Sequence, residues 1–269
     1  MRFLHQTLAR TSLNLALDEA LLERAEHRLP ADQPAQELPG AAPNHHSQRN
    51  PLSETDDQVV RLWQPTQYAV IVGRGSRVNE EVDVEFCRSR KIPIFRRHSG
   101  GATVVIGPGC WMYSAVVSLE RHPELRDLSL AHRHVMTRLE TAVQPFCPDV
   151  RIQGICDLTA NNRKVSGNSL KVARRHFLYH GTLLVEFDLD LLSRCLLTAP
   201  RQPDYRSQRS HRDFVDNLPV PDPEAFNHGF PTEFCSAWQA LSPVTNPPLE
   251  ETERLAIEKY EQDEWTFRR

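Results

Sequence analysis

The sequence of 269 residues is poor in glycine, with only 11, and in aromatic residues, which make up 7%. Its six cysteines form no Cys-x-x-Cys pair and no spacing typical of a metal site. They are Cys87, Cys110, Cys147, Cys156, Cys195 and Cys235. This pattern predicts reduced thiols, and it argues against a disulfide framework and a protein-bound metal.

A strong excess of charge and a long apolar run are also missing. The net charge of −3 gives no electrostatic case for nucleic-acid binding. No window approaches the length of a membrane span, and residues 1–5 contain no apolar signal core. The 39% of hydrophobic residues can form the core of one large domain. We therefore expect a cytoplasmic enzyme that binds neither nucleic acid nor membrane.

Apolar periodicity indicates the fold class. Helical spacing over residues 13–28, where Ser12 can serve as the N-cap, and over residues 128–143 predicts two amphipathic helices. The β-branched runs at 59–63 and 68–72 predict a first pair of strands. The pattern as a whole predicts an α+β protein with mixed β-sheets flanked by helices.

Residues 29–57 have a different composition from the rest of residues 1–199, which we interpret as one domain and which the family resemblance described below implies to be catalytic. This segment contains five prolines and almost no apolar pattern, so we predict a disordered insertion. The pair His45-His46 lies within it without a nearby carboxylate or cysteine, which favours two solvated side chains over a metal site.

A glycine-rich motif lies between two strand-like runs. Residues 92–97 lead into Ser99-Gly100-Gly101, and residues 103–106 follow. Two residues without a Cβ let the backbone come close to a ligand, and their amides can face an anion while a preceding arginine supplies charge. The motif favours a phosphate or adenylate cradle, with an ordinary turn and solvated arginines as the alternative.

A second group of residues surrounds a lone lysine, Lys164. Asn161-Asn162 has the chemistry of a turn between two strands. A hairpin with its tip near residues 173–177 would bring Lys164 and His180 towards the same region of a sheet. Because an ammonium is a compact charge, Lys164 can clamp a phosphate or donate a proton.

The two motifs resemble those of the lipoate–protein ligase and octanoyltransferase family, whose fold is shared with biotin–protein ligases. The family's Arg-Arg-x-Ser-Gly-Gly-Gly-Ala-Val is similar to residues 96–104. Its Asp-Leu, turn, Arg-Lys-Val-Ser-Gly and later His-His-Gly-Thr-Leu-Leu are similar to residues 157–184. Residues 14–22 resemble the family's first helix and residues 73–83 its next landmark. The resemblance extends from about residue 12 to residue 197.

The resemblance implies a role for each matching residue. Lys164 matches the family's hallmark active-site lysine, which contacts the phosphate and carbonyl of an acyl-adenylate or assists acyl transfer. The residues implied to bind the acyl-adenylate are Arg97, Ser99, Gly100, Gly101, Ala102, Asp157, Ser166, Gly167, His180 and Gly181. The walls of a dry tunnel for the acyl chain are expected from Val104, Ile106, Tyr113 and Leu183.

The implied reaction uses ATP and lipoate as substrates, with Mg²⁺ able to accompany the ATP and no permanently bound cofactor. The acyl-adenylate would give its lipoyl or octanoyl group to a lysine of a lipoyl-acceptor domain. Adenylation is needed because a carboxylate is a poor leaving group. Lys164 and backbone amides would then position and stabilise the reacting groups.

Departures from the family pattern leave alternatives open. Ligases follow the first motif with His-Asp-x-Gly-Asn, where this chain has residues 106–110, and residues 200–269 do not resemble the accessory domain of two-domain ligases. A separate accessory subunit can supply the missing part. Otherwise the chain is an octanoyltransferase that uses Cys156 and an acyl carrier protein, or a non-catalytic lipoyl-binding subunit. The resemblance places Cys156 near the cysteine of one transferase branch, although it also fits a buried thiol.

Residues 200–269 are predicted to form a helical extension with surface helices at 226–241 and 249–260. Its first part is basic and punctuated by proline, and carries Arg201, Arg206, Arg209 and Arg212. These arginines can cap the active site or meet an acidic acceptor domain. A solvated loop is the alternative.

Overall fold

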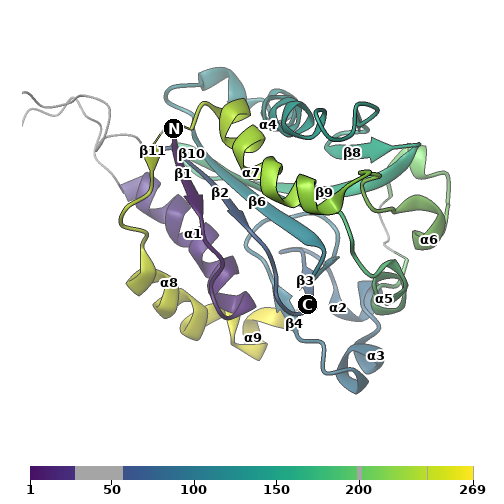
Figure 1. Ribbon diagram of the computed structural model, residues 1–269. Coiled ribbons are helices and arrows are strands. Elements are labelled where there is room, and N and C mark those ends of the chain that lie inside the picture. The colour runs from purple at the N-terminus through teal and green to yellow at the C-terminus, as the bar shows by residue number, and fades with distance from the viewer. Residues whose placement is uncertain (28–56, 199–201, 241, 269) are drawn as a thin grey trace, which may run out of the picture.

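The computed structural model describes residues 1–27, 57–198, 202–240 and 242–268 (Figure 1). The strands are β1 Arg2–His5, β2 Val59–Trp63, β3 Ala69–Val72, β4 Ile94–Arg96, β5 Val104–Ile106, β6 Cys110–Ser118, β7 Arg151–Gln153, β8 Asp157–Ala160, β9 Arg163–Val172, β10 His176–Leu184 and β11 Ser242–Pro243. The helices are α1 Thr11–His27, α2 Val78–Glu81, α3 Val84–Ser89, α4 Leu128–Val143, α5 Leu189–Cys195, α6 His211–Phe214, α7 Pro223–Trp238, α8 Leu249–Leu255 and α9 Asp263–Thr266. Short 3-10 turns are η1 Pro123–Arg126 and η2 Asp204–Arg206, and a π-helical turn is η3 Ala256–Tyr260. The predicted insertion at 29–57, except Asp57, and the pair His45-His46 lie outside the described residues.

Within the described residues the strands form a large sheet, in the order β11-β1-β2-β6-β10-β9-β8-β7, and a small sheet, in the order β4-β3-β5. Parallel and antiparallel neighbours occur in both sheets, for example β1 with β2 and β2 with β6. The predicted α+β fold with mixed sheets is confirmed.

The predicted pairing of the runs at 59–63 and 68–72 is wrong. β2 lies beside β6 in the large sheet, whereas β3 lies between β4 and β5 in the small one. Every residue of both strands is buried. Neither strand therefore shows the alternation of apolar and polar residues that marks an exposed face, and the sequence carries no signal for the sheet to which each strand belongs.

Helix α1 covers one face of the large sheet, with α8 against its outer side (Figure 1). Leu17 and Leu21 of α1 belong to the same buried cluster as Val116 of β6. The helix begins at Thr11, so the prediction of Ser12 as the N-cap is wrong. The Ser12 hydroxyl instead donates to Glu261 Oε1 at 2.6 Å, because the C-terminal residues pack over this end of α1.

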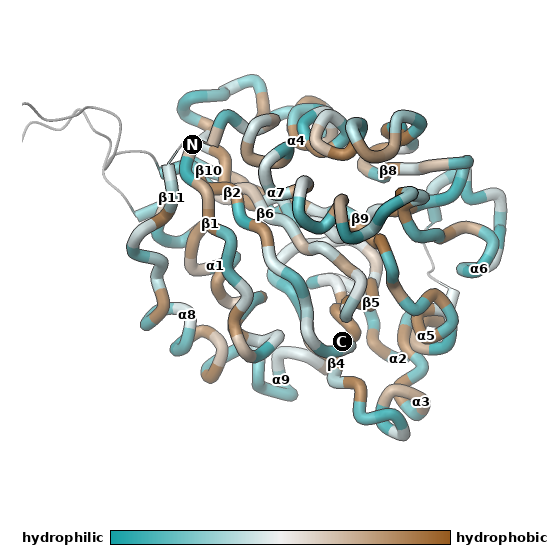
Figure 2. Tube along the Cα trace, in the orientation of Figure 1, coloured by the Kyte–Doolittle hydropathy of each residue, from teal (hydrophilic) through white to brown (hydrophobic). Residues whose placement is uncertain are grey.

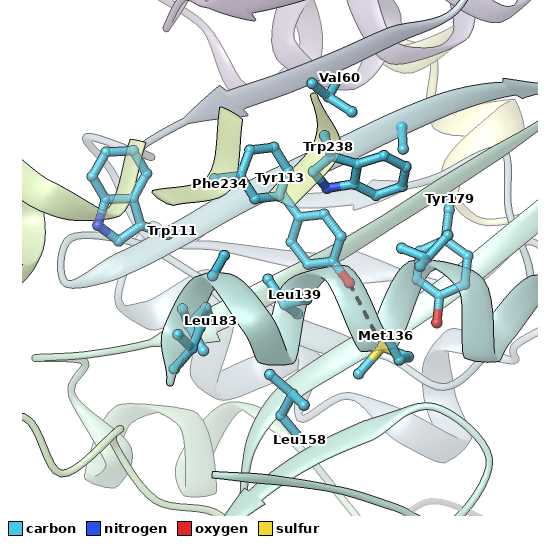
Figure 3. Close-up of a cluster of buried hydrophobic side chains, with 14 of the residues drawn as sticks. Val60, Trp111, Tyr113, Met136, Leu139, Leu158, Tyr179, Leu183, Phe234 and Trp238 are labelled. Carbon is cyan, nitrogen blue, oxygen red and sulfur yellow. Dashed lines mark hydrogen bonds between the residues drawn. The ribbon is translucent and has the colours of Figure 1, made fainter. Parts of the chain in front are cut away.

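Helices α4 and α7 cover the opposite face, and α7 is part of the core. Phe226, Phe230 and Phe234 are fully buried, which contradicts the predicted surface helix at 226–241. Their spacing of four residues places them on one face of the helix, directed at the sheet. Figure 3 shows Phe234 and Trp238 beside side chains of the sheet and of α4.

The second helix predicted in the tail is α8, which continues into η3. Hydrophilic and hydrophobic residues are mixed along it (Figure 2), and the buried ones, including Leu255 and Tyr260, share a cluster with Leu15 of α1. The Tyr260 hydroxyl donates to Glu19 Oε2 at 2.7 Å. These contacts join the tail to the rest of the fold, while the predicted domain boundary at 199/200 stays a prediction.

The hairpin predicted around Lys164 and His180 is confirmed. Asn161 and Asn162 have φ values of 51° and 57°, so both form the left-handed turn between β8 and β9. Strands β9 and β10 pair in antiparallel register, with His180 opposite Ser169. Among the described residues, no helix is long and apolar enough to cross a membrane.

Candidate active site

Arg97 holds the glycine-rich loop between β4 and β5 together. Its guanidinium donates to the carbonyls of Ile71 at 3.0 Å and Ala102 at 2.8 Å, and also to that of Gly100. Burial lowers the pKa of Arg97 to about 10, so it stays charged at neutral pH. The alternative of a turn with solvated arginines does not fit, because Arg97 is 6% exposed.

Gly101 is the residue of this loop whose backbone needs glycine. Its φ of 81° lies in the left-handed region, and an added Cβ would lie 3.0 Å from Arg97 Nη2. The opposite loop is equally tight, since a Cβ on Gly73 would lie 1.9 Å from the Gly101 carbonyl oxygen. An added Cβ on Gly100 would meet nothing within 4 Å, so Gly100 borders open space.

The sequence left open which of two arginines serves the loop, and the structure separates them. Arg96 is fully buried and donates to the carbonyls of Gly73 at 2.7 Å, Ser76 at 2.8 Å and Thr266 at 2.9 Å. It ties the 73–76 loop to α9 and does not line either of the cavities described below.

His180 belongs to a buried polar chain of four residues. Its Nε2 shares a short hydrogen bond with Ser99 Oγ, and its Nδ1 lies 3.6 Å from Asp18 Oδ2. Asp18 Oδ1 accepts from Arg61 at 2.8 Å. Burial acts to raise the pKa of Asp18, but Arg61 and His180 outweigh it and hold the pKa below its usual range. Both ring nitrogens thus face polar partners within the protein, and His180 also lines the second of the cavities described below.

Asp18 and Arg61 were missed by the sequence analysis. Asp18 is an acidic residue on the apolar face of a predicted helix, and such a residue is buried only with a partner. Arg61 interrupts the apolar run of β2 in the same way. A charged residue within each apolar pattern was the signal available in the sequence. Nothing in the sequence shows that Asp18 and Arg61 form an ion pair with each other.

Lys164 is held by a buried acid. Its Nζ lies 2.7 Å from Asp157 Oδ1, and Asp157 Oδ2 accepts from the Tyr205 hydroxyl at 2.7 Å. Burial raises the pKa of Tyr205, and the charge of Asp157 raises it further, so Tyr205 remains a donor. Asp157, which the resemblance placed against the ligand, lines neither cavity described below and instead fixes the lysine.

Two adjoining cavities of about 120 Å³ and 110 Å³ meet at Lys164. The residues lining both are Ala102, Thr103, Val104, Lys164, Gly167 and Thr182. The first cavity continues along Ser166, Leu184, Leu192, Leu196, Pro203, Arg206, His211, Phe214 and Val215. The second continues along Leu15, Asp18, Ile71, Arg97, Met112, Ser169, His180 and Gly181. The two sequence motifs thus face each other across one site.

The predicted wall of the acyl tunnel needs correction. Val104 lines both cavities, but Ile106, Tyr113 and Leu183 line neither of them. Tyr113 and Leu183 point into a core because each is next to a cavity-lining residue, Met112 and Leu184, and successive residues of a strand face opposite sides of the sheet. Ile106 is fully buried in the other hydrophobic cluster. Apolar wall is supplied by Met112 and other residues from β3, β6 and α1.

Asn168 is a further residue that the sequence analysis passed over. Its amide donates to the Cys156 carbonyl at 2.6 Å and to Ser166 Oγ at 2.7 Å, and its oxygen accepts from the Tyr113 hydroxyl. A Cβ on Gly181 would lie 1.8 Å from Asn168 Oδ1. Glycine is therefore needed at position 181 for this contact between β9 and β10.

Cys156 lies close to Lys164 in sequence but lines neither of the two cavities. Burial and the charge of Asp157 raise the pKa of the thiol to about 11, despite the opposing effect of Lys164. Its Sγ contacts the Asn168 carbonyl at 3.7 Å. The thiolate needed for nucleophilic attack is thus disfavoured in this arrangement.

Comparison with known proteins supports the motif assignment. The lipoyl protein ligase A/B catalytic domain matches residues 41–226. The chain belongs to this family. It is 26% identical over 215 residues to the Mycoplasma genitalium protein named "Probable lipoate-protein ligase A", covering 78% of this chain and 62% of that protein. It is 24% identical over 208 residues to lipoate–protein ligase 1 of Staphylococcus aureus, covering 75% and 62%. This lipoyl ligase family member thus spans less than two thirds of either relative.

Solved structures of the family share the fold. A bi-partite lipoate protein ligase from Thermoplasma acidophilum has a TM-score of 0.74 at 21% identity, covering 99% of this chain and 95% of that one. P. falciparum LipL1 in complex with lipoate has a TM-score of 0.67 at 16% identity, covering 100% and 74%. At such identities the likeness shows the arrangement of the sheets and helices.

Proposed function

We propose that this chain transfers a lipoyl or octanoyl group from an acyl-adenylate to a lysine of a lipoyl-acceptor domain. The observation that carries the proposal is the place of Lys164 in the wall that two cavities share. We assign the acyl chain to the second cavity, whose apolar wall includes Met112, and the phosphate of the adenylate to the first cavity, on the other side of Lys164. The relatives are lipoate–protein ligases by name, and one solved family structure is described as bound with ATP.

In the proposed reaction the acyl carbonyl and the phosphate of the adenylate lie next to Lys164 Nζ. The neutral acceptor amine attacks the carbonyl carbon, a C–N bond forms, the C–O bond to phosphate breaks, and AMP leaves. The amine loses a proton to solvent or AMP. Negative charge grows on the carbonyl oxygen and then on the phosphate, and the Lys164 ammonium stabilises both. Asp157 keeps that ammonium in place at 2.7 Å.

A protein site for Mg²⁺ has little support. Among the described residues no group of three or more His, Cys, Asp or Glu side chains can hold a metal ion. The carboxylate in the second cavity, Asp18, is already bound by Arg61. Any Mg²⁺ would therefore be held mainly by the phosphate oxygens of ATP.

A separate accessory subunit is part of the proposal. The T. acidophilum ligase is described as bi-partite and is named together with its E2 lipoyl domain, and this chain covers 95% of the matched chain. Adenylate formation from free lipoate would then require the partner, whereas transfer from a ready-made adenylate would not.

The decisive experiment is intact-mass spectrometry of a purified lipoyl-acceptor domain incubated with this protein. One reaction contains lipoate and ATP, a second contains synthetic lipoyl-adenylate, and a third contains octanoyl carrier protein. We expect the mass of a lipoyl group with the adenylate, and none in matched reactions with Lys164→Ala. Modification from the carrier protein alone would replace the ligase proposal by the transferase.

The transferase alternative depends on Cys156 and is tested separately. In the ligase version Cys156→Ser keeps most activity, because a buried thiol only packs. In the transferase version the loss is several orders of magnitude, since the nucleophile is removed. The altered sequence at 106–110 motivates this alternative, and the raised thiol pKa weighs against it. The non-catalytic alternative predicts adenylate binding without any transfer.

A further inference from the structure

Arg206 is a buried cation on the wall of the first cavity. It lies in η2 and is 5% exposed. Burial lowers the pKa of Arg206, and the charge of neighbouring Arg209 lowers it further. Within the described residues no carboxylate forms an ion pair with it, whereas Arg212 nearby is paired with Asp190 at 2.6 Å. A desolvated charge without a counter-ion is costly, so its retention needs an explanation.

Two contacts hold the Arg206 side chain, and a third holds its backbone. Arg206 Nε donates to the Arg209 carbonyl at 2.9 Å, and Arg209 Nε donates back to the Arg206 carbonyl at 3.1 Å. The guanidinium lies over the ring of Phe214, with its central carbon 5.0 Å from the ring centroid. Its two Nη groups make no hydrogen bond to the described residues. The donors of a fixed, planar fork therefore remain for a ligand.

The remaining charges around the first cavity are compensated. Lys164 is paired with Asp157, whose other oxygen is bound by Tyr205, the residue before Arg206. Burial and the charge of Arg206 lower the pKa of His211 to about 4, so that ring is neutral at neutral pH. Among the described residues that line this wall, Arg206 is thus the charge without a counter-ion, and the surrounding apolar residues strengthen its attraction for an anion.

We propose that Arg206 recognises the phosphate of a ligand in the first cavity, together with Lys164 of the second sequence motif. The inference rests on the proposed function and adds to it a residue from outside both sequence motifs. A phosphate ester matches the guanidinium fork with two parallel hydrogen bonds. That phosphate is supplied either by an acyl-adenylate or by the phosphopantetheine arm of an acyl carrier, and the two sources are separable by experiment.

The test uses pairs of probes that differ in the phosphate. A non-hydrolysable phosphonate analogue of octanoyl-adenylate is compared with 5′-octanoyl-adenosine, and S-octanoyl-4′-phosphopantetheine with S-octanoyl-pantetheine. Isothermal titration calorimetry measures each probe with wild type, Arg206→Met and the control Arg212→Met. We expect at least a tenfold weaker binding of one phosphate-bearing probe by Arg206→Met, and less than a twofold change with its uncharged partner or with Arg212→Met. The pair of probes whose phosphate-bearing member loses affinity identifies the source of the phosphate.

Thermal unfolding separates recognition from a structural role. Removing a buried charge without a counter-ion should offset the loss of its hydrogen bond to the Arg209 carbonyl and of its contact with Phe214, so the melting temperature of free Arg206→Met should stay close to that of wild type, whereas loss of a purely structural arginine would lower it. Arg206→Lys should recover part of the affinity. The proposal is overturned if Arg206→Met binds the phosphate-bearing probes as wild type does, if both members of a pair weaken equally, or if wild type binds neither phosphate-bearing probe. The acyl-transfer assay reports separately on the proposed function: transfer that persists in Arg206→Met with unchanged KM removes this inference alone.

Discussion

Lys164 is held in position by one buried carboxylate, that of Asp157. This contact predicts the acyl-transfer rates of two Lys164 variants. Lys164→Ala should reduce acyl transfer by at least 100-fold while circular dichroism shows a retained fold. Lys164→Arg should not restore the rate, because a planar fork cannot replace a compact charge 2.7 Å from Asp157. Initial rates measured with synthetic adenylate check both variants. A wild-type rate in Lys164→Ala would remove this residue from the mechanism.

The backbone at Gly101 gives a second prediction at the scale of one residue. Gly101→Val should destabilise the fold by roughly 1–3 kcal/mol and abolish adenylate binding, because the left-handed φ excludes valine and the new side chain meets Arg97. Denaturant unfolding and calorimetry measure the two effects. Gly75→Ala is the matched control, since a Cβ there meets nothing within 4 Å. Unchanged affinity in a folded Gly101→Val protein would contradict the proposed cradle.

At the scale of elements, a buried histidine joins β10 to α1. His176 Nδ1 lies 3.0 Å from Glu26 Oε1, and its Nε2 lies 2.9 Å from Asp57 Oδ2. Burial acts to lower the pKa of His176, but the two carboxylates outweigh it and raise the pKa above 6.5. Burial acts to raise the pKa of both carboxyls, but the backbone amide of Arg175 and His176 outweigh it and lower the pKa of Glu26, and His176 and Arg121 lower that of Asp57.

The sign of the resulting pH dependence follows from these shifts. The raised histidine pKa gives stability that is fully present below about pH 6.5 and is lost as pH rises through the folded value. The lowered carboxyl pKa values give stability that is lost as pH falls below about 4. His176→Gln should therefore abolish the loss of melting temperature that wild type shows on going from pH 6 to pH 9. Thermal unfolding across that range measures it, and parallel curves for both proteins would disprove the role of His176.

At the scale of the whole molecule, α7 shares one core with β6, β10 and α4. Phe230→Ala should cost about 3–5 kcal/mol, because it leaves a cavity in this cluster. Leu249→Ala, at a position 46% exposed on α8, should change stability by less than about 0.5 kcal/mol. Chemical denaturation should show one transition in both variants. A separate early transition in Phe230→Ala would support the predicted division at residue 199.

Much of the candidate site is local in the sequence. Arg97 and Ala102 of the first motif and Lys164 and Gly167 of the second line one or both of the cavities that meet at Lys164, whereas Ser99, Gly100 and Gly101 line neither. Asp18, Arg61 and Arg206 are different, because each is distant in sequence from the groups it serves. A single charged residue in an apolar run indicates that it has a buried partner, but the sequence does not show which residue that partner is.

The sequence by itself determined the longer helices, the hairpin around Lys164, the family and the two motifs, because helical periodicity, turn residues and short motifs depend on neighbours along the chain. Only the tertiary structure decided that β2 and β3 belong to different sheets, that α7 is buried, and that η2 brings Arg206 to the first cavity. These outcomes depend on contacts between residues far apart in the sequence. A fully apolar strand or an aromatic face of a helix can be buried against several different elements. Only the packing of the whole chain selects the element that it contacts.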